Sequence, residues 1–257
     1  MPQAKYTTQT LNCSRNNLKI YGRVFIPQSA SSTNKLPAII LAHGYNSSST
    51  NLYTMAQLFA ENGIVAYVFD FCGGSNSSMS DGKTTEMSVL TEKADMLAVY
   101  QTIKKLNYVD TNNMYLFGAS QGGLIASLCA AELTSAIKAL FLFYPAYNIP
   151  DLAKAAVQAN GGNIPNQIVM MDMKIGKIYF DDIMKVDVYN EIAKYKGPVK
   201  IYHGTNDTTV PYSYSQKALN YYKNASLTTV PGEDHRFSTE YTYTYVADMV
   251  RYIAANK

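Results

Sequence analysis

Short apolar runs alternate along the chain with longer amphipathic stretches. Residues 38–42, 64–69 and 139–143 are almost wholly apolar, which is typical of strands covered on both faces. Between residues 85 and 108, apolar side chains recur three and four positions apart, which predicts a helix with one broad apolar face. Strands that alternate with helices indicate crossover connections, so we expect a mostly parallel sheet with helices on both faces.

The other expected elements follow the same alternation, and the predicted fold class is therefore α/β. Strands are predicted at residues 18–26, 38–42, 64–69, 114–117, 139–143, 199–202 and 227–230. Helices are predicted at residues 53–61, 85–108, 121–133, 212–222 and 239–255.

Residues 150–196 interrupt the alternation of strands and helices. The segment contains Gly161, Gly162, Pro165 and several methionines. We interpret it as a cap inserted above the carboxyl edge of the sheet, within a single domain of residues 1–257. An elaborated surface loop is the alternative, but the apolar content favours a cap because such side chains need something to cover.

Length and composition narrow the class of protein. A chain of 257 residues and 28.5 kDa suits one α/β domain with an insertion. Hydrophobic residues make up 47% and charged residues 16%, which excludes intrinsic disorder. The net charge of +3 is small and scattered, so we expect no nucleic-acid partner. No apolar run approaches the roughly 18 residues of a membrane span, so we expect no membrane partner either.

The cysteines and the N-terminal residues predict a cytoplasmic location. The first residues contain no apolar core of a signal peptide. Cys13, Cys72 and Cys129 are odd in number and far apart, with no CxxC pair. This usage is typical of a reduced intracellular protein without structural zinc.

The sequence GASQG at residues 118–122 carries the strongest chemical signal. It directly follows a predicted strand and opens a predicted helix, which is the context that the G-x-S-x-G nucleophile elbow requires. Ser120 would sit in a strained turn with its hydroxyl exposed above the sheet, beside the amides of a helix N-terminus. The alternative is a glycine-rich turn with an incidental serine, but the strand and the helix on either side favour the nucleophile.

A serine nucleophile needs a base, and the chain has three histidines. His43 and His203 each precede a glycine at the end of a predicted strand, so we expect both to hold backbone and loops. His235 lies in a loop between the last predicted strand and helix, at the carboxyl edge where open α/β sheets place their sites. His235 is therefore the predicted base, although a surface loop histidine would look the same in sequence.

The acid that supports the base is predicted to be Asp207, just after the strand at residues 199–202. The order Ser120, Asp207, His235 is the serine–acid–histidine order of α/β-hydrolases. Asp234 is the main rival, but side chains of adjacent loop residues such as Asp234 and His235 usually diverge. The poorer candidates lie in the inserted segment: Asp181, Asp182 and Asp187.

The tetrahedral intermediate of acyl transfer needs two fixed donors for its oxyanion. The backbone amide of Gln121, which follows the nucleophile, is one predicted donor. The backbone amide of Tyr45 is the other, since Gly44 in the HGYN loop allows a tight turn after the strand. An ordinary turn is the alternative for this loop.

Five motifs together resemble the serine α/β-hydrolases: HGYN, DFCGGSNSS, GASQGG, HGTNDTTVP and EDHRF. The resemblance extends over residues 18–253. Within that superfamily the chain is most similar to the bacterial cinnamoyl (feruloyl) esterases, small intracellular enzymes with a short cap after the sixth strand. One departure is Ala119, where family members often carry histidine.

The resemblance implies a serine esterase that hydrolyses carboxylic esters, in particular hydroxycinnamoyl esters, through an acyl-enzyme. The implied partner is a small-molecule ester; we expect no metal or organic cofactor, and we leave a homodimer open. Rival activities with the same three residues are those of a short-chain carboxylesterase, a monoacylglycerol lipase, an acyl-CoA thioesterase and a serine aminopeptidase. A non-catalytic binding protein on the same fold is the rival from another class.

Two cap residues are predicted to bind a substrate phenol, because a buried hydroxyl must not stay unpaired. Tyr179 lies where a turn at Gly176 could fold the segment over the pocket. Asp151 resembles an acidic position at the cap of the cinnamoyl esterases. The alternatives are that Tyr179 packs inside the cap and that Asp151 caps the helix that starts at Leu152.

Overall fold

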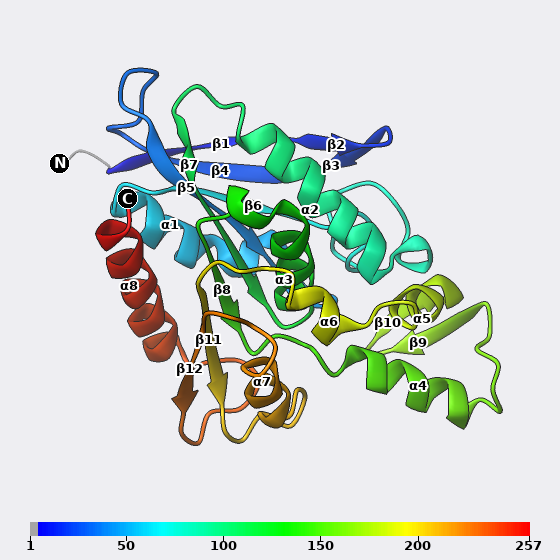
Figure 1. Ribbon diagram of the computed structural model, residues 1–257. Helices are drawn as coiled ribbons and strands as arrows, with labels where there is room; N and C mark the ends of the chain where they lie inside the picture. The colour runs from blue at the N-terminus through cyan, green and yellow to red at the C-terminus, as the bar shows by residue number, and fades with distance from the viewer. Residues whose placement is uncertain (1–4) are drawn as a thin grey trace.

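An eight-stranded sheet organises residues 5–257, which the computed structural model describes (Figure 1). Its strand order is β1-β4-β6-β5-β7-β8-β11-β12. The strands are β1 (Tyr6–Thr10), β4 (Gly22–Pro27), β5 (Leu36–Ala42), β6 (Val65–Phe69), β7 (Val109–Ala119), β8 (Ala139–Phe143), β11 (Val199–Gly204) and β12 (Ala225–Val230). β4 pairs antiparallel with β1 and β6, and every other pairing is parallel, as predicted.

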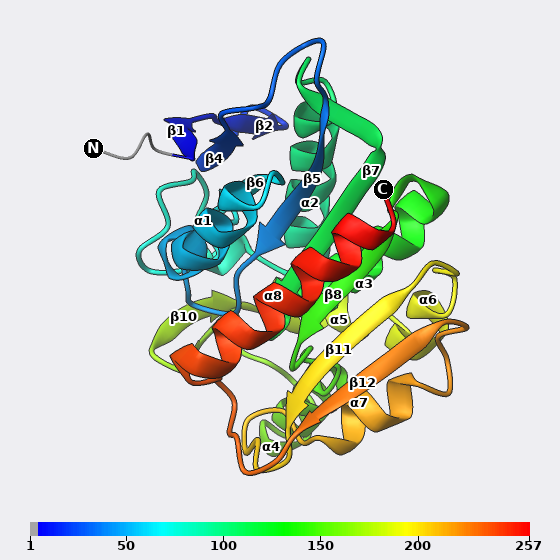
Figure 2. The same ribbon diagram turned by 90° about the vertical axis from the view of Figure 1, so that its left-hand side faces the viewer.

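Helices cover both faces of the sheet. The helices outside the inserted segment are α1 (Tyr53–Glu61), α2 (Val89–Ile103), α3 (Gln121–Leu133), α7 (Ser213–Ala218) and α8 (Thr239–Ala255). α1 and α8 pack together on one face, through side chains such as Phe59 and Met249 (Figure 2). α2 and α3 pack together on the other face, where Met96 and Leu124 join the larger apolar core. The predicted α/β class is confirmed.

The N-terminal strands differ from the prediction of one strand at residues 18–26. β3 (Leu18–Ile20) pairs with β2 (Cys13–Arg15) in a separate hairpin, and β4 begins only at Gly22. A Cβ at Gly22 would lie 1.9 Å from the Tyr67 hydroxyl, so the backbone comes very close to that ring. β1 is almost wholly exposed, so it lacks the apolar signal of a buried strand.

The helix predicted at residues 85–108 is shorter in the structure. α2 begins after Ser88, whose side chain forms a capping box with Thr91. The turn before it, Thr84–Glu86, is a 3₁₀ helix. The apolar pattern therefore extends beyond the helix on both sides, because apolar residues of the flanking turns, such as Met87, also face the core.

The inserted segment follows β8, which is the sixth strand of the main sheet along the chain. It contains α4 (Ile149–Ala159), β9 (Gln167–Met170), β10 (Met173–Gly176), α5 (Lys177–Ile183) and α6 (Val188–Ile192). β9 and β10 form an antiparallel hairpin. The hydroxyl of Tyr45 donates to the carbonyl of Met170, and the hydroxyl of Thr84 donates to that of Lys174, so the hairpin lies against two loops of the main domain.

None of the helices within residues 5–257 combines the length and the apolar content that a bilayer span requires.

Candidate active site

Ser120 occupies a strained turn between β7 and α3. Its φ is 55° and its ψ is −123°, a backbone conformation that side-chain-bearing residues rarely adopt. A Cβ at Gly118 would lie 2.1 Å from the carbonyl oxygen of Gly122, and one at Gly122 would lie 2.3 Å from the carbonyl oxygen of His43. Close backbone contacts therefore require glycine at both positions, and the turn has the form of a nucleophile elbow.

The structure brings Ser120, His235 and Asp207 together from three distant parts of the chain. Nε2 of His235 lies 2.9 Å from Oγ of Ser120, and Nδ1 lies 2.8 Å from Oδ2 of Asp207. A carboxylate only accepts hydrogen bonds, so Nδ1 carries the proton and Nε2 is free to accept from the serine hydroxyl. This is the geometry that a serine nucleophile and its base require.

The carboxylate of Asp207 is held by four donors. Besides His235, Nε2 of His203 lies 3.1 Å from Oδ2, and the amides of Thr209 and Val210 donate to Oδ1 at 2.9 and 2.7 Å. Burial by itself would raise the pKa of Asp207, but these hydrogen bonds outweigh it and hold the pKa well below its usual range. Asp207 is therefore ionised beside the imidazole at neutral pH.

The loop after β5 lies against the serine. A Cβ at Gly44 would be 3.1 Å from Cβ of Ser120, so the backbone of this loop passes close to the serine. Tyr45 is the next residue of the loop. Gln121 is the first residue of α3, and its amide is one of the N-terminal donors that have no partner within a helix. The loop that carries Tyr45 and the first turn of α3 therefore lie next to Ser120, and the role of their two amides as oxyanion donors stays a prediction.

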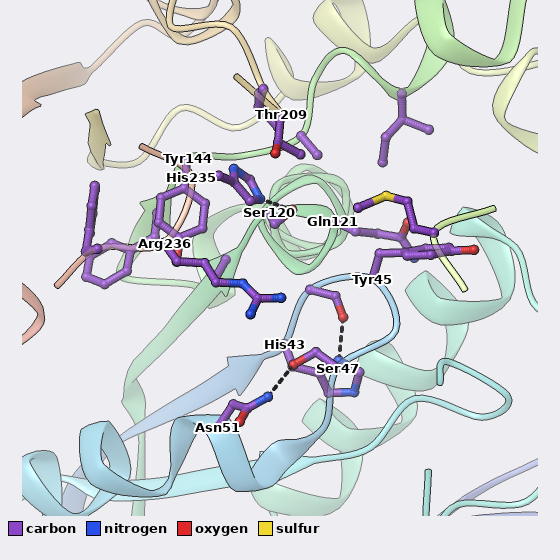
Figure 3. Close-up of a pocket in the computed structure, with 18 of the residues that line it drawn as sticks. His43, Tyr45, Ser47, Asn51, Ser120, Gln121, Tyr144, Thr209, His235 and Arg236 are labelled. Carbon is purple, nitrogen blue, oxygen red and sulfur yellow. Dashed lines mark hydrogen bonds between the residues drawn. The ribbon is translucent and has the colours of Figure 1, made fainter. Parts of the chain in front are cut away.

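A cavity of about 410 Å³ opens above Ser120 and His235 (Figure 3). The inserted segment contributes mostly apolar side chains to it, including Ile149, Leu152 and Met170. Among the residues that line it within the described chain there is neither an aspartate nor a glutamate. The cavity is therefore suited to a mostly apolar substrate, and the basic side chains among its described lining residues are His43, His235 and Arg236.

Comparison with known proteins identifies the family. The model of the family described as serine aminopeptidase, S33, matches residues 33–178, more than half of the chain. The chain belongs to this family. No curated protein sequence matched it.

Solved structures confirm that this hydrolase has the α/β-hydrolase fold. Est1E from Butyrivibrio proteoclasticus, in a structure with ferulic acid bound, is 27% identical and has a TM-score of 0.85 over 96% of this chain and 98% of that chain. DcsB, in complex with a substrate analogue, is 21% identical with a TM-score of 0.78 over 98% of this chain and 100% of that chain. Mouse alpha/beta hydrolase domain-containing protein 10 is 17% identical with a TM-score of 0.76 over 97% and 100%.

The rival acid and the other two histidines of the hydrolase contact backbone and loops. Asp234 accepts hydrogen bonds from the amides of Thr208 and His235, and no bond joins its carboxylate to the His235 ring. Nδ1 of His43 lies 2.8 Å from the carbonyl oxygen of Gly44. His203 lies beneath Asp207, so it holds the acid as well as its loop.

Tyr179 and Asp151 have different environments, although both were predicted to bind a substrate phenol. Tyr179 lines the cavity, and its hydroxyl donates to Oε1 of Gln121 at 2.7 Å. Asp151 is not among the lining residues; it lies in the first turn of α4, accepts a hydrogen bond from Tyr214 and lies 3.7 Å from Lys154. The carboxylate of Asp151 is thus exposed beside Tyr214 and Lys154, outside the lining of the cavity, and its role in binding a phenol stays a prediction.

Sequence reasoning missed Glu92, a buried carboxyl group below the site. Its Oε2 accepts from Nε2 of Gln121 at 2.7 Å, so a hydrogen-bond chain runs from Glu92 through Gln121 to Tyr179. Burial raises the pKa of Glu92 to about 8, and the hydrogen bond from Gln121 opposes part of that rise. The apolar stripe of α2 hid this residue, since a glutamate in such a helix is usually on the solvated face.

Proposed function

We propose that this hydrolase is a serine esterase that hydrolyses carboxylic esters, with hydroxycinnamoyl esters as its substrate class. The observation that carries the proposal is the hydrogen-bonded chain from Ser120 through His235 to Asp207, which opens into the apolar cavity. In this proposal Ser120 is the nucleophile, His235 the base and Asp207 the acid that supports it.

The reaction proceeds in two acyl transfers. Oγ of Ser120 attacks the ester carbonyl while Nε2 of His235 takes its proton, and the amides of Tyr45 and Gln121 hold the oxyanion. The imidazolium, stabilised by Asp207, gives that proton to the departing alcohol. A water molecule then attacks the acyl-enzyme with the same base, which releases the carboxylic acid and returns the proton to the serine.

The lining of the cavity favours an ester over an aminoacyl substrate. A serine aminopeptidase, the activity in the family's description, must hold the charged amine of its substrate, and a carboxylate is the usual partner for such a group. Within the described part of the chain, no carboxylate lines the cavity. An uncharged ester avoids the cost of placing an ammonium group without a partner.

Aromatic side chains support the acyl class. The rings of Tyr45 and Tyr179 lie edge to face with centroids 6.0 Å apart, and both residues line the cavity. The Tyr179 hydroxyl donates to Gln121, so its oxygen still accepts the proton of a substrate phenol. Est1E, whose structure holds ferulic acid, gives independent support for a hydroxycinnamoyl group.

A substrate comparison tests the acyl class. Wild type should hydrolyse methyl p-coumarate with a higher kcat/KM than methyl cinnamate, which lacks the phenol. Tyr179→Phe should remove most of this preference, on the order of tenfold for one hydrogen bond, and spare the cinnamate rate. Tyr189→Phe is the matched control, because Tyr189 lies in α6 of the inserted segment and does not line the cavity. Equal losses on both substrates in Tyr179→Phe, or no preference in wild type, would contradict the hydroxycinnamoyl class.

A further inference from the structure

The cavity has a second part that the acyl group does not occupy in the proposed mode of binding. The inserted segment lines one part, under which we place the acyl group. The other part is lined from the main domain by Asn51, Leu52 and Met55 near α1 and by Arg236 and Phe237 next to the base. Both groups of residues line the same cavity as Ser120, and Figure 3 shows Arg236 and Asn51 near the loop that carries His43. With the acyl group placed under the inserted segment, we place the alcohol half of the ester in the second part.

Arg236 is a cation without an ionic partner in this second part. No carboxylate within residues 5–257 forms a salt bridge with it, although Asp234 is only two positions away along the chain. Figure 3 shows its side chain directed into the cavity, toward the loop that carries His43 and Ser47. The carboxylate of Asp207 cannot compensate it, since its oxygens already accept from His235, His203 and two amides.

Tyr144 adds a hydrogen-bond donor beside Arg236. Its φ of 36° is in the left-handed region, which is strained for a bulky residue and is a feature that accumulates at functional sites. Its ring lies against His235 and Phe237, with centroids 4.6 and 4.9 Å away. Burial raises the pKa of Tyr144, and the charge of Arg236 opposes part of that rise, so the hydroxyl stays protonated at neutral pH. Within the described chain this hydroxyl has no hydrogen-bond partner of its own.

We propose that Arg236 and Tyr144 form an anion subsite that binds a carboxylate on the alcohol half of the ester. The guanidinium fork matches a carboxylate with two parallel hydrogen bonds, and the neutral tyrosine hydroxyl donates a third. This inference rests on the proposed esterase activity. It adds the class of the leaving group: a hydroxy acid, esterified through its hydroxyl.

Two pairs of esters test the subsite. In each pair the leaving alcohol is either glycolate, which carries a carboxylate, or its N-methylamide, which is similar in size and neutral. One pair has a p-coumaroyl acyl group and the other a butyryl group. Wild type should prefer the glycolate ester in both pairs, and sodium chloride at about 0.5 M should reduce the preference because it screens exposed charges.

The variant Arg236→Gln should lower kcat/KM for the glycolate esters by about 10- to 100-fold, the range expected when a hydrogen-bonded charge is lost. Its rates on the two neutral esters, whose leaving alcohol is the N-methylamide of glycolate, should stay close to wild type. Tyr144→Phe should show a smaller loss in the same direction. Arg251→Gln is the matched control, since Arg251 is an exposed arginine of α8 that does not line the cavity.

The outcomes separate the failure of the subsite from the failure of the proposed function. If Arg236→Gln leaves the ratio of rates between the glycolate ester and the neutral ester unchanged, or if wild type shows no preference, the anion subsite is overturned. Preference for glycolate in the butyryl pair alone, with no turnover of p-coumaroyl esters, supports the subsite and contradicts the hydroxycinnamoyl class. Absence of turnover for all four esters contradicts the esterase proposal and the subsite that depends on it.

Discussion

The elbow and the inserted segment differ in what fixes their side chains. At the elbow, backbone contacts between neighbouring strand ends set every position: Ser120 accepts at its carbonyl from the amide of Ala146 and donates from its own amide to Phe143. The inserted segment depends instead on contacts with distant loops, such as the bond from the Tyr45 hydroxyl to the carbonyl of Met170. Under the proposed function, the rigid sheet therefore places the reacting residues, and a segment packed onto the sheet selects the substrate.

The largest expected effect tests whether the loop after β11 supplies the acid. Asp207→Asn should lower kcat by on the order of 10⁴, because an amide stabilises the wrong tautomer of His235. Asp234→Asn should cost far less, since the Asp234 carboxylate contacts Thr208 and the backbone instead of the ring. Steady-state kinetics of the two variants decide the assignment. A similar loss in both, or the reverse ranking, would contradict the assignment of Asp207 as the acid.

The second prediction compares one glycine from each region. Gly122→Ala should lower the free energy of unfolding by about 3 kcal/mol or more, because the new Cβ would meet the backbone of Ala42, the last residue of β5, and of His43 after it. Gly161→Ala, in the inserted segment, has no atom within 4 Å of the new Cβ and should cost only the strain of its φ of 66°, about 1 kcal/mol. Urea unfolding measures both. Equal costs would mean that the elbow is no more tightly packed than the cap.

The third prediction concerns Glu92, which links the two regions through Gln121. Its pKa is raised from 4.5 to about 8 on folding, so between these values the unfolded chain loses a proton that the folded chain keeps. Wild type should therefore lose stability as the pH rises through this window. Glu92→Gln keeps a carbonyl acceptor for Gln121 and cannot titrate, so its stability relative to wild type should increase from pH 5 to pH 8.

Chemical denaturation at both pH values checks the sign. If the difference between Glu92→Gln and wild type stayed constant, or became less favourable at the higher pH, Glu92 would not be a neutral buried carboxyl group in the folded protein.

The same difference between regions explains what could be predicted from sequence. The positions of Ser120 and Asp207 follow from local rules, since Ser120 directly follows β7 and Asp207 comes three residues after β11, and apolar residues define both strands. The hairpin of β9 and β10 does not follow from local rules. Apolar and polar residues alternate only weakly along its short strands, and it contacts loops that are distant along the chain. Asp151 shows the limit of sequence-based prediction. Its position just after the sixth strand gave no indication that its carboxylate contacts Tyr214, which lies 63 residues further along the chain.

Residues that act through strain or burial were also beyond a reading of the sequence. Nothing in the letters FYPA indicates that Tyr144 has a φ of 36°. The burial of Glu92 depends on Gln121 lying opposite it, which only the packing of α2 on α3 brings about. Arg236 follows His235 in sequence, but its lack of an acidic partner is visible only once the loops are assembled.

Covalent labelling of Ser120 tests the central claim most directly. A fluorophosphonate probe should modify the wild-type protein at one site, and peptide mass spectrometry should place the adduct on Ser120. Ser120→Ala should fold normally, take up no label and lose at least about a thousandfold in ester turnover. Labelling at another residue, or near-full turnover in Ser120→Ala, would contradict the account of Ser120 as the nucleophile.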